Sequence, residues 1–438
     1  MRATLAVAAL GAAMLASSVA FAQARKLTVD EAVQLALDTN PGLQAGVAQV
    51  RGTEAQAKAV RGHLLPTVFV ADELDHWNSA YVDMVSMSPT SPALPFSVRD
   101  QNTNIFNAGV RQPIIGLGHL AHEYKAQTRA ADATSAQVDA ARSDLRAAVE
   151  TFYLQLFEAR ALEQIARASE DELAEQVTIA DARLKAGVLT RADVLRVRVS
   201  QANAKQQEIQ AHAQAEVARA NLLGRVGLPL DDRSIDFAEP TQLLSQTSAP
   251  LPEVTQAQTS ALRARPEMKQ KKLEAEAASE GASATGWALL PELNVEGGYM
   301  RTDGTIFNPA NATYVILKAQ WAIWEWGASH YAHQAATEKA QASEFQVKEQ
   351  ERRVDVEVTS AIAQATAAAA AVTVAEQTIE SAEEAYRVTK AALAAGTATT
   401  TDLLDAQSAL TQARLNLTRA HYEDAMTRVT LRRGLGAS

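Results

Sequence analysis

Apolar side chains recur every three or four residues along two long stretches of the chain, residues ~119–186 and ~328–395. In the first stretch the series includes Leu145, Val149 and Phe152, and equivalent positions follow 209 residues later. A sustained seven-residue repeat predicts helices that pack as a left-handed coiled coil. At about 1.5 Å per residue, each helix would be roughly 100 Å long. No ordinary globular core needs a helix of that length.

Four shorter stretches alternate apolar and polar positions, which predicts strands with one apolar face. In one of them Leu293, Val295 and Tyr299 lie on the face opposite Glu292 and Asn294. The predicted strands cover residues ~66–77, ~102–114, ~291–301 and ~313–323. The first alternates least cleanly, and we assign it as a strand mainly because its counterpart in the second half of the chain is one.

The chain contains an internal repeat, seen in "AGVLTRADVL" from Ala186 and "AGTATTTDLL" from Ala395, 209 residues apart. Nearer the start the offset is larger, because "HLLPTVFV" from His63 aligns with "ALLPELNV" from Ala288, 225 residues later. The difference falls between the two strands of each pair, at residues 74–111 in the first copy. We expect a loop there, because loops tolerate changes of length.

These elements divide the chain into a signal peptide, two repeats and a linker. Residues 1–22 have an early positive charge, an apolar run and a small-x-small triplet, which are typical of a secretory signal peptide. The repeats cover 23–226 and 255–438, and the linker, 227–254, holds four prolines that break the helical period. In each repeat a helix, two strands, a long helix, a turn and a last helix are expected. The first helix is placed near 30–63, the turns at 187–192 and 396–401, and the last helices end near 224 and 433.

Composition excludes several functions. The chain has no cysteine, so disulfides, thiolate metal sites, a cysteine nucleophile and a lipidated cysteine are not expected. The formal net charge of −10 does not suit nucleic acid, which is bound through basic patches. Outside the signal peptide we find no apolar run near 18 residues, so a membrane span would require strands closed into a barrel.

The alternating segments fit a transmembrane β-barrel, in which strands of about ten residues are apolar on the outside. A soluble hairpin is the alternative. Aromatic residues in or beside these segments suit the membrane–water interfaces; the candidates are Trp321, Trp324, Trp326 and Phe106. Four strands are too few to close a barrel, whose smallest known form has eight. Three chains would supply twelve.

The order of elements, found twice, resembles that of the TolC-type outer-membrane efflux proteins. The resemblance covers about Leu27 to Gly436 and is most specific in "LTVDEAVQLALDTNPGLQA", in the Leu-Leu-Pro entries at Leu64 and Leu289, and in the two turns. It implies an α+β membrane protein that forms a homotrimer. A twelve-stranded barrel in the outer membrane of a Gram-negative bacterium would continue as a helical tunnel into the periplasm.

By this resemblance the two turns form the periplasmic tip, where a periplasmic adaptor and an inner-membrane pump of the RND, ABC or MFS type dock. The docking candidates are Gly187, Val188, Leu189, Thr190, Gly396, Thr397, Ala398 and Thr399, expected to be exposed. Asp402 and Asp405 fall where the tunnel narrows and would form stacked acidic rings that favour cations, with Asp193 as the counterpart of Asp402. A helix N-cap or first-turn role is the alternative for each aspartate.

The chain departs from the family pattern at the tip. Closed tips can be held by an arginine and a tyrosine at the positions that are Ala398 and Leu393 here, so Arg191 or Lys390 would have to substitute. Two histidine pairs, His119 with His122 and His330 with His333, do not superpose between the repeats. We therefore expect no metal site and no cofactor, and place these histidines at a solvated junction between barrel and tunnel.

The sequence thus predicts a passive exit duct for drugs, metal ions or other small molecules, and no enzyme activity. Two alternatives stay open at this point. One is a channel for type I protein secretion, because cargo depends mainly on the inner-membrane partner. The other is a soluble periplasmic coiled-coil scaffold or adaptor whose strand pairs are ordinary hairpins.

Overall fold

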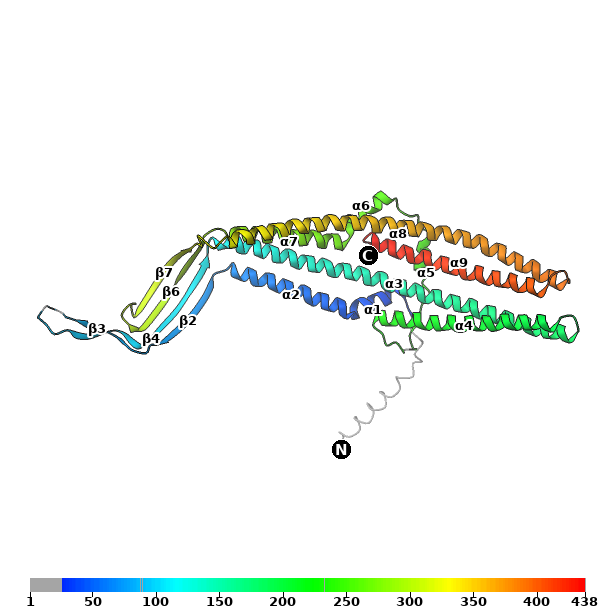
Figure 1. Cartoon of the computed structure of the whole chain (residues 1–438), viewed down its shortest axis with the longest axis horizontal. Helices are drawn as coiled ribbons and strands as arrows, with labels where there is room; N and C mark the ends of the chain where they lie inside the picture. Colours follow the sequence, from blue (N-terminus) through cyan, green and yellow to red (C-terminus); the bar gives the residue numbers. More distant parts are fainter. Residues whose placement is uncertain (1–25, 87, 89, 232, 438) are drawn as a thin grey trace, which may run out of the picture. The chain divides into compact units, whose positions relative to one another are not determined.

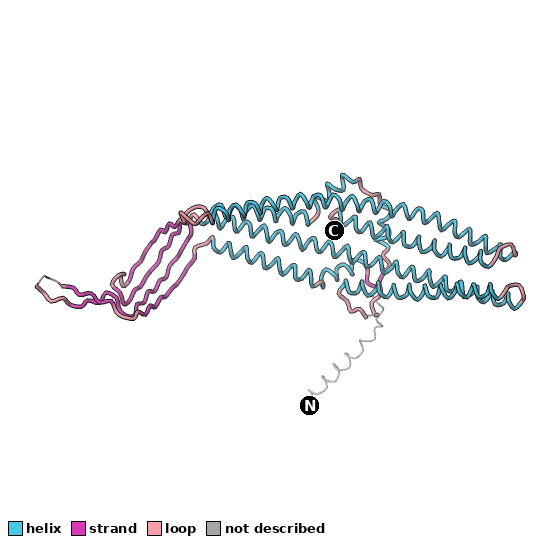
Figure 2. Tube along the Cα trace, viewed as in Figure 1, coloured by secondary structure: helices cyan, strands magenta, loops and turns pink. Residues whose placement is uncertain are grey.

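The computed structural model describes residues 26–86, 88, 90–231 and 233–437 (Figure 1). The predicted signal peptide, 1–22, lies outside the described residues. The chain folds as two compact units, and the long helices belong to both. Unit 1 contains residues 26–44, 140–265 and 353–437, and unit 2 contains residues 45–139 and 266–352. Most of the chain is helical, and the longer strands gather in one sheet in unit 2 (Figure 2).

Two long helices dominate the fold, as the heptad pattern predicts. They are α3 (Gly116–Lys185, 70 residues) and α8 (Ala328–Ala394, 67 residues). Each is followed by a tight turn and a shorter helix, α4 (Arg191–Val226) or α9 (Thr400–Gly434). One helical hairpin therefore occurs in each half of the sequence.

The helix that opens each half is broken by proline. The expected helix near 30–63 is two helices, α1 (Val29–Thr39) and α2 (Pro41–His63). Its counterpart is likewise α6 (Val254–Ala264) followed by α7 (Pro266–Trp287). Asn40 has extended backbone, with ψ 116°. The ring of the following proline disfavours helical geometry at that residue, which the 3.6-residue pattern alone does not reveal.

The linker between the halves belongs to the core of unit 1. Its strand β5 (Asp236–Phe237) pairs in parallel with β1 (Lys26–Leu27), and the short helix α5 (Thr241–Ser245) and a 3-10 turn (Gln246–Ser248) follow it. The phenol of Tyr153 on α3 is fully buried and donates to the carbonyl oxygens of Leu27, at 2.8 Å, and Ala238. This tyrosine therefore joins both strands of the small sheet, β1 and β5, to the long helix α3.

The sheet of unit 2 is antiparallel and has the order β2–β4–β6–β7. Its strands are β2 (Thr67–His76), β4 (Leu94–Pro113), β6 (Glu292–Thr305) and β7 (Asn311–Gln320). A further strand, β3 (Tyr81–Val85), pairs with the first part of β4. The expected loop within 74–111 is therefore wrong in part: β4 begins eight residues before the predicted strand and forms a two-stranded ribbon with β3.

Among the described residues, α8 is the one helix long and apolar enough, by length and composition, to cross a membrane. This corrects the expectation that no such run exists outside the signal peptide. Only 28% of its apolar window is buried. The helix contains an alanine-rich stretch in which Ala361, Ala365 and Ala368 are buried. A helix of 67 residues is roughly three times as long as the hydrocarbon core is thick, so we assign α8 to the helical bundle.

Candidate functional site

The first candidate site is the pair of turns that close the two helical hairpins of unit 1. At the first turn Gly187 has φ 76°, and the amide of Val188 donates to the carbonyl oxygen of Arg183 at 2.9 Å. At the second turn Gly396 has φ 78°, and the amide of Thr397 donates to Ala392 at 2.9 Å. A left-handed residue after a helix is favourable for glycine alone among common residues, which explains the Ala-Gly step in both repeats.

A threonine and an aspartate then start the next helix in each copy. The hydroxyl oxygen of Thr399 accepts from the amide of Asp402 at 3.2 Å, and the Asp402 carboxylate accepts from the amide of Thr399 at 2.8 Å. Thr190 and Asp193 make the same capping box at the start of α4. The structure thus gives both repeat-matched aspartates the helix-capping role that was the alternative to a pore role.

These hydrogen bonds lower the pKa of both carboxyls. For Asp193 the largest cause is the hydroxyl of Thr190, and for Asp402 it is the backbone amide of Thr399. Hydrogen bonds to the ionised form favour that form. Both side chains are therefore negatively charged at neutral pH, and amide donors already offset part of that charge.

Asp405 differs from Asp402. It is exposed on the next turn of α9, and no hydrogen bond or ion pair holds it among the described residues. Residues three apart lie on one side of a helix. Among the described residues, Asp405 is therefore the carboxylate of this pair whose charge no neighbouring donor offsets.

The two hairpins pack on each other near the turns. Leu189 of the first turn is half-buried. It packs on a cluster around Val194 and Val197 of α4, as does Leu404 of α9 in the second hairpin. Leu189 and Ala398 are thus half-buried and not freely exposed as expected. The remaining docking candidates, Gly187, Val188, Thr190, Gly396, Thr397 and Thr399, are exposed, and Val188 has 71% of its surface accessible.

One polar contact bridges the hairpins beside the turns. A guanidinium nitrogen of Arg196 on α4 donates to the hydroxyl of Thr401 on α9 at 3.4 Å. The two expected substitutes do not do this in the described part of the chain: Lys390 lies over the ring of Tyr386, and Arg191 is exposed without such a contact. Sequence reasoning missed Arg196, since nothing in its spacing points across the hairpins.

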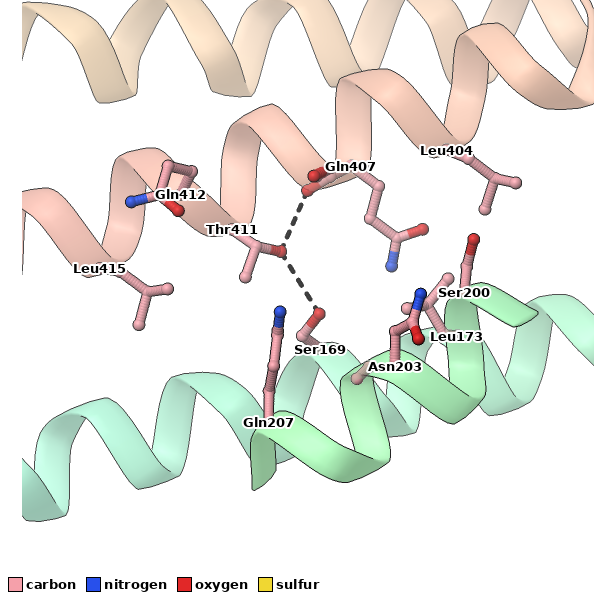
Figure 3. A pocket seen from close by; sticks show the side chains of 12 residues that line it. Ser169, Leu173, Ser200, Asn203, Gln207, Leu404, Gln407, Thr411, Gln412 and Leu415 are labelled. Atoms are coloured by element: carbon pink, nitrogen blue, oxygen red, sulfur yellow. Dashed lines mark hydrogen bonds between the residues drawn. The ribbon is translucent and has the colours of Figure 1, made fainter. Parts of the chain in front are cut away.

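A polar seam lies further along the same helices, between α9 and the pair α3 and α4 (Figure 3). It surrounds a cavity of about 230 Å³. Gln407 is only 2% exposed. Its side-chain nitrogen donates to Glu172 at 3.3 Å, and its side-chain oxygen Oε1 has no hydrogen-bond partner among the described residues. The hydroxyl of Thr411 donates to the backbone carbonyl of Gln407 and lies 3.3 Å from the hydroxyl of Ser169.

A polar residue at an apolar heptad position is the sequence signal for this seam. Gln407 lies between Leu403 and Leu410 with the 4, 3 spacing of buried residues, and all three are buried. An unpaired buried amide oxygen costs about 1–3 kcal/mol, so the contact between the hairpins is weakened there.

The second candidate site is the sheet of unit 2. Within the described residues β2 and β7 each pair on one side only, so both are edges. Val68, Val70, Val315 and Leu317 are exposed on these edge strands, between 64% and 82%. Unpaired strand edges and exposed apolar side chains of this kind are typical of a surface that another chain or a membrane covers.

The interface aromatics lie mainly after this sheet. Trp321, Trp324 and Trp326 follow β7 and are 60%, 75% and 85% exposed, whereas Phe106 of β4 is half-buried. The rings of Trp324 and Trp326 meet edge to face, with centroids 5.6 Å apart. Trp326 has φ 56°, in the left-handed region that is unusual for a bulky residue.

The two histidine pairs have neighbours other than a metal-ligating cluster in the part of the chain that the structure describes. Among the described residues no group of three or more His, Cys, Asp or Glu side chains could hold a metal ion. His122 instead lies 2.6 Å from a carboxylate oxygen of Glu280 on α7. His119 contacts the backbone carbonyl of Ala284 at 2.9 Å, and His333 contacts Thr285 at 3.2 Å. Three of the four histidines thus contact α7 rather than solvent alone.

A comparison with protein families matches two stretches of the chain to one family model. Residues 32–228 and 258–437 match the model described as outer membrane efflux protein. A search of curated protein sequences found no match.

Solved structures share the fold at low sequence identity. VceC, an outer membrane protein of Vibrio cholerae, matches with TM-score 0.78 and 17% identity over 93% of this chain and 96% of its own. CusC matches with TM-score 0.78 and 16% identity over 94% and 92%. The MtrE outer membrane channel of Neisseria gonorrhoeae, in its open state, matches with TM-score 0.75 and 18% identity over 93% and 88%.

Proposed function

This chain belongs to the outer membrane efflux protein family, and is thus a protein of the outer membrane; on that premise we propose that three copies form a passive exit duct for small molecules. The duct receives its cargo from a periplasmic adaptor and an inner-membrane pump, and releases it outside the cell. Drugs and metal ions are the cargo classes we expect.

The observation that carries the proposal is the pair of free sheet edges. β2 and β7 both lack a partner on one side within the described residues, and four strands cannot close on themselves. A membrane offers no water to satisfy the exposed backbone groups of an edge, so the edges must pair with other copies. Three copies give twelve strands, which is within the range of known barrels.

Side-chain exposure supports the membrane position of the sheet. Val68, Val70, Val315 and Leu317 would face lipid, because these apolar side chains are exposed on the two edge strands. The exposed tryptophans, Trp321, Trp324 and Trp326, would lie at the membrane–water interface, which suits their amphipathic rings. The half-buried Phe106 would contribute less.

The two turns of unit 1 form the proposed adaptor-docking surface. The exposed residues Val188, Thr190, Thr397 and Thr399 would contact helices of the adaptor, while the half-buried Leu189 packs between the hairpins. An RND, ABC or MFS pump in the inner membrane would supply the energy, because the chain has no phosphate-binding motif.

Threefold symmetry would turn the aspartates at the turns into acidic rings. Asp405 is exposed and unpaired, so three copies of it would give the stronger ring. Asp402 and Asp193 would add charge that is partly offset by their capping hydrogen bonds. Such rings favour cations over anions.

Reconstitution tests the proposal directly. The molar mass of the detergent-purified protein is measured by light scattering. The protein is then inserted into planar bilayers. A trimer that conducts cations in preference to anions supports the duct. A protein that stays monomeric, or that carbonate extracts from membranes without detergent, contradicts it and favours the soluble scaffold. Export of a small dye rather than a protein substrate, with the pump present, distinguishes efflux from type I secretion.

A further inference from the structure

We propose that the ribbon formed by β3 and residues 94–99 of β4 packs on the neighbouring copy of this chain, against the turn between its β6 and β7. The ribbon would link adjacent subunits outside the membrane. The inference rests on the proposed trimer and adds an interface to it.

The ribbon has an apolar surface that the rest of the chain does not cover. Tyr81 to Val85 pair with Arg99 to Leu94, and the ribbon extends beyond the four-stranded sheet (Figure 1). Its large apolar side chains are between 45% and 62% exposed: Tyr81, Val82, Met84, Val85, Leu94 and Phe96. A two-stranded ribbon is marginal in water by itself, and an exposed apolar patch of this kind marks an interaction surface.

Lipid does not suit as the covering partner. β2 and β7 have ten residues each, which is already the length of one membrane crossing. β4 has twenty residues and is about 68 Å long, whereas the apolar band of a barrel is about 25 Å tall. The polar sequence Asp100 to Asn104 separates the ribbon from the apolar part of β4. The ribbon therefore lies beyond the hydrocarbon.

Strand order shows which side of the ribbon is free. β2 and β3 both pair with the same side of β4, first at residues 102–111 and then at residues 94–99, while β6 occupies the other side. The outer edge of β3 thus continues the outer edge of β2. In the proposed trimer the β2 edge meets β7 of the next copy, so β3 meets the residues that precede that β7.

Those residues are also apolar and exposed. Ile306 and Phe307, in the turn before β7, are 56% and 68% exposed. The amide of Ile306 donates to the carbonyl oxygen of Val98 at 3.1 Å, and Tyr81 pairs with the adjacent Arg99. The turn and the base of the ribbon therefore lie at the same position along the strand direction, on opposite sides of β4. Closing the sheet with a second copy brings two exposed apolar surfaces together.

The absence of cysteine from the sequence makes cross-linking a clean test. Val82→Cys is combined in turn with Ile306→Cys, Phe307→Cys and Asn308→Cys in the full-length protein, and the trimer is oxidised. We expect covalent dimers and trimers on non-reducing denaturing gels. Within one chain β4 separates β3 from β6 by two strand spacings, about 9.5 Å, which exceeds the ~7 Å limit for a disulfide. Higher bands therefore report links between copies.

Matched controls separate this interface from the trimer itself. The single-cysteine variants and Val82→Cys with Val315→Cys, on the proposed lipid face, should give no covalent oligomer. Light scattering before oxidation measures assembly in the same samples. A trimer that yields no covalent species with any of the three pairs overturns the ribbon interface and leaves the duct intact. A protein that never trimerises overturns both.

A second measurement does not depend on cysteine geometry. Met84→Asp, on the same face of the ribbon as Val82, should lower the temperature at which the trimer dissociates by several degrees, because it places a charge in the apolar contact. Ser79→Asp, on the exposed connection before β3, is the matched control. Equal dissociation temperatures for the two variants would contradict the interface.

Discussion

Asp402 and Thr399 form reciprocal hydrogen bonds, a capping box, at the start of α9. The Asp402 carboxylate accepts from the amide and the hydroxyl of Thr399 at 2.8 and 2.7 Å, and the hydroxyl oxygen accepts from the amide of Asp402 at 3.2 Å. The carboxylate of Asp402 is therefore part of the helix start, whereas the carboxylate of Asp405, one turn later, is not. This difference separates two roles that the sequence alone assigns to both residues.

Asp405→Asn should reduce cation selectivity more than Asp402→Asn. The charge of Asp402 is partly offset by the amide donors at the helix N-terminus, and Asn retains the capping geometry. The reversal potential in a salt gradient across a planar bilayer measures the effect. Glu423→Gln is the control. This exposed carboxylate lies about 27 Å from Asp405 along α9, which is more than the distance over which salt screens exposed charges. Equal effects of the two aspartate variants would contradict the assignment.

Acid should loosen both turns. The pKa values of Asp193 and Asp402 are below the ordinary 3.8, so their capping contribution is complete above the unfolded-state pKa. It is lost as pH falls through the lower folded-state value. Hydrogen exchange of peptides covering residues 187–193 and 396–402, corrected for intrinsic rates, should accelerate below about pH 4. In Asp402→Asn the second peptide should lose this pH dependence, and the first should keep it.

Arg196→Ala should raise the open probability of the duct. The contact of Arg196 with Thr401 joins the two hairpins, and Arg196 is largely exposed, so its loss costs no more than about 1 kcal/mol per copy. That corresponds to roughly a fivefold shift of the opening equilibrium in each subunit. Single-channel recording measures it. Arg191→Ala removes an equal charge without this contact, and an equal response to that change would disprove the role of Arg196.

Gln407→Leu should stabilise the bundle of unit 1, or leave its stability unchanged, although it removes a hydrogen bond to Glu172. Leucine continues the apolar series of Leu403 and Leu410 and removes a buried carbonyl oxygen that has no partner. Gln407→Ala should instead destabilise it by about 1–3 kcal/mol, because a cavity remains. Thermal unfolding followed by circular dichroism checks both. A leucine variant that melts below the wild type would contradict this interpretation.

Tyr153→Phe should destabilise unit 1 by about 1–3 kcal/mol, because the part-buried carbonyl oxygen of Ala238 loses the phenol donor and that of Leu27 keeps only the amide of Ala238. Burial raises the pKa of this phenol far above its ordinary value, so the hydroxyl keeps its proton at every pH used. Denaturant unfolding measures the loss. Tyr331→Phe, at a position 65% exposed, should change the free energy of unfolding by less than about 0.5 kcal/mol.

Local patterns in the sequence were enough to specify the elements that depend on periodicity. The heptad series around Leu145 and Val149 specified the long helices, and the Ala-Gly steps at Gly187 and Gly396 specified the turns, because positive φ is a property of single residues. Alternation specified most of the sheet. The internal repeat, together with these patterns, is enough to indicate the family.

Contacts between residues far apart in the sequence could not be predicted without the packed structure. The contact of Arg196 with Thr401, 205 residues away, depends on how two hairpins pack, and no local pattern encodes that register. The ribbon of β3 was missed because its strand has five residues, too few for alternation to distinguish it from a loop. The partial burial of Leu189 likewise depends on how the two hairpins pack, whereas the capping boxes of Asp193 and Asp402 are local contacts between residues three apart.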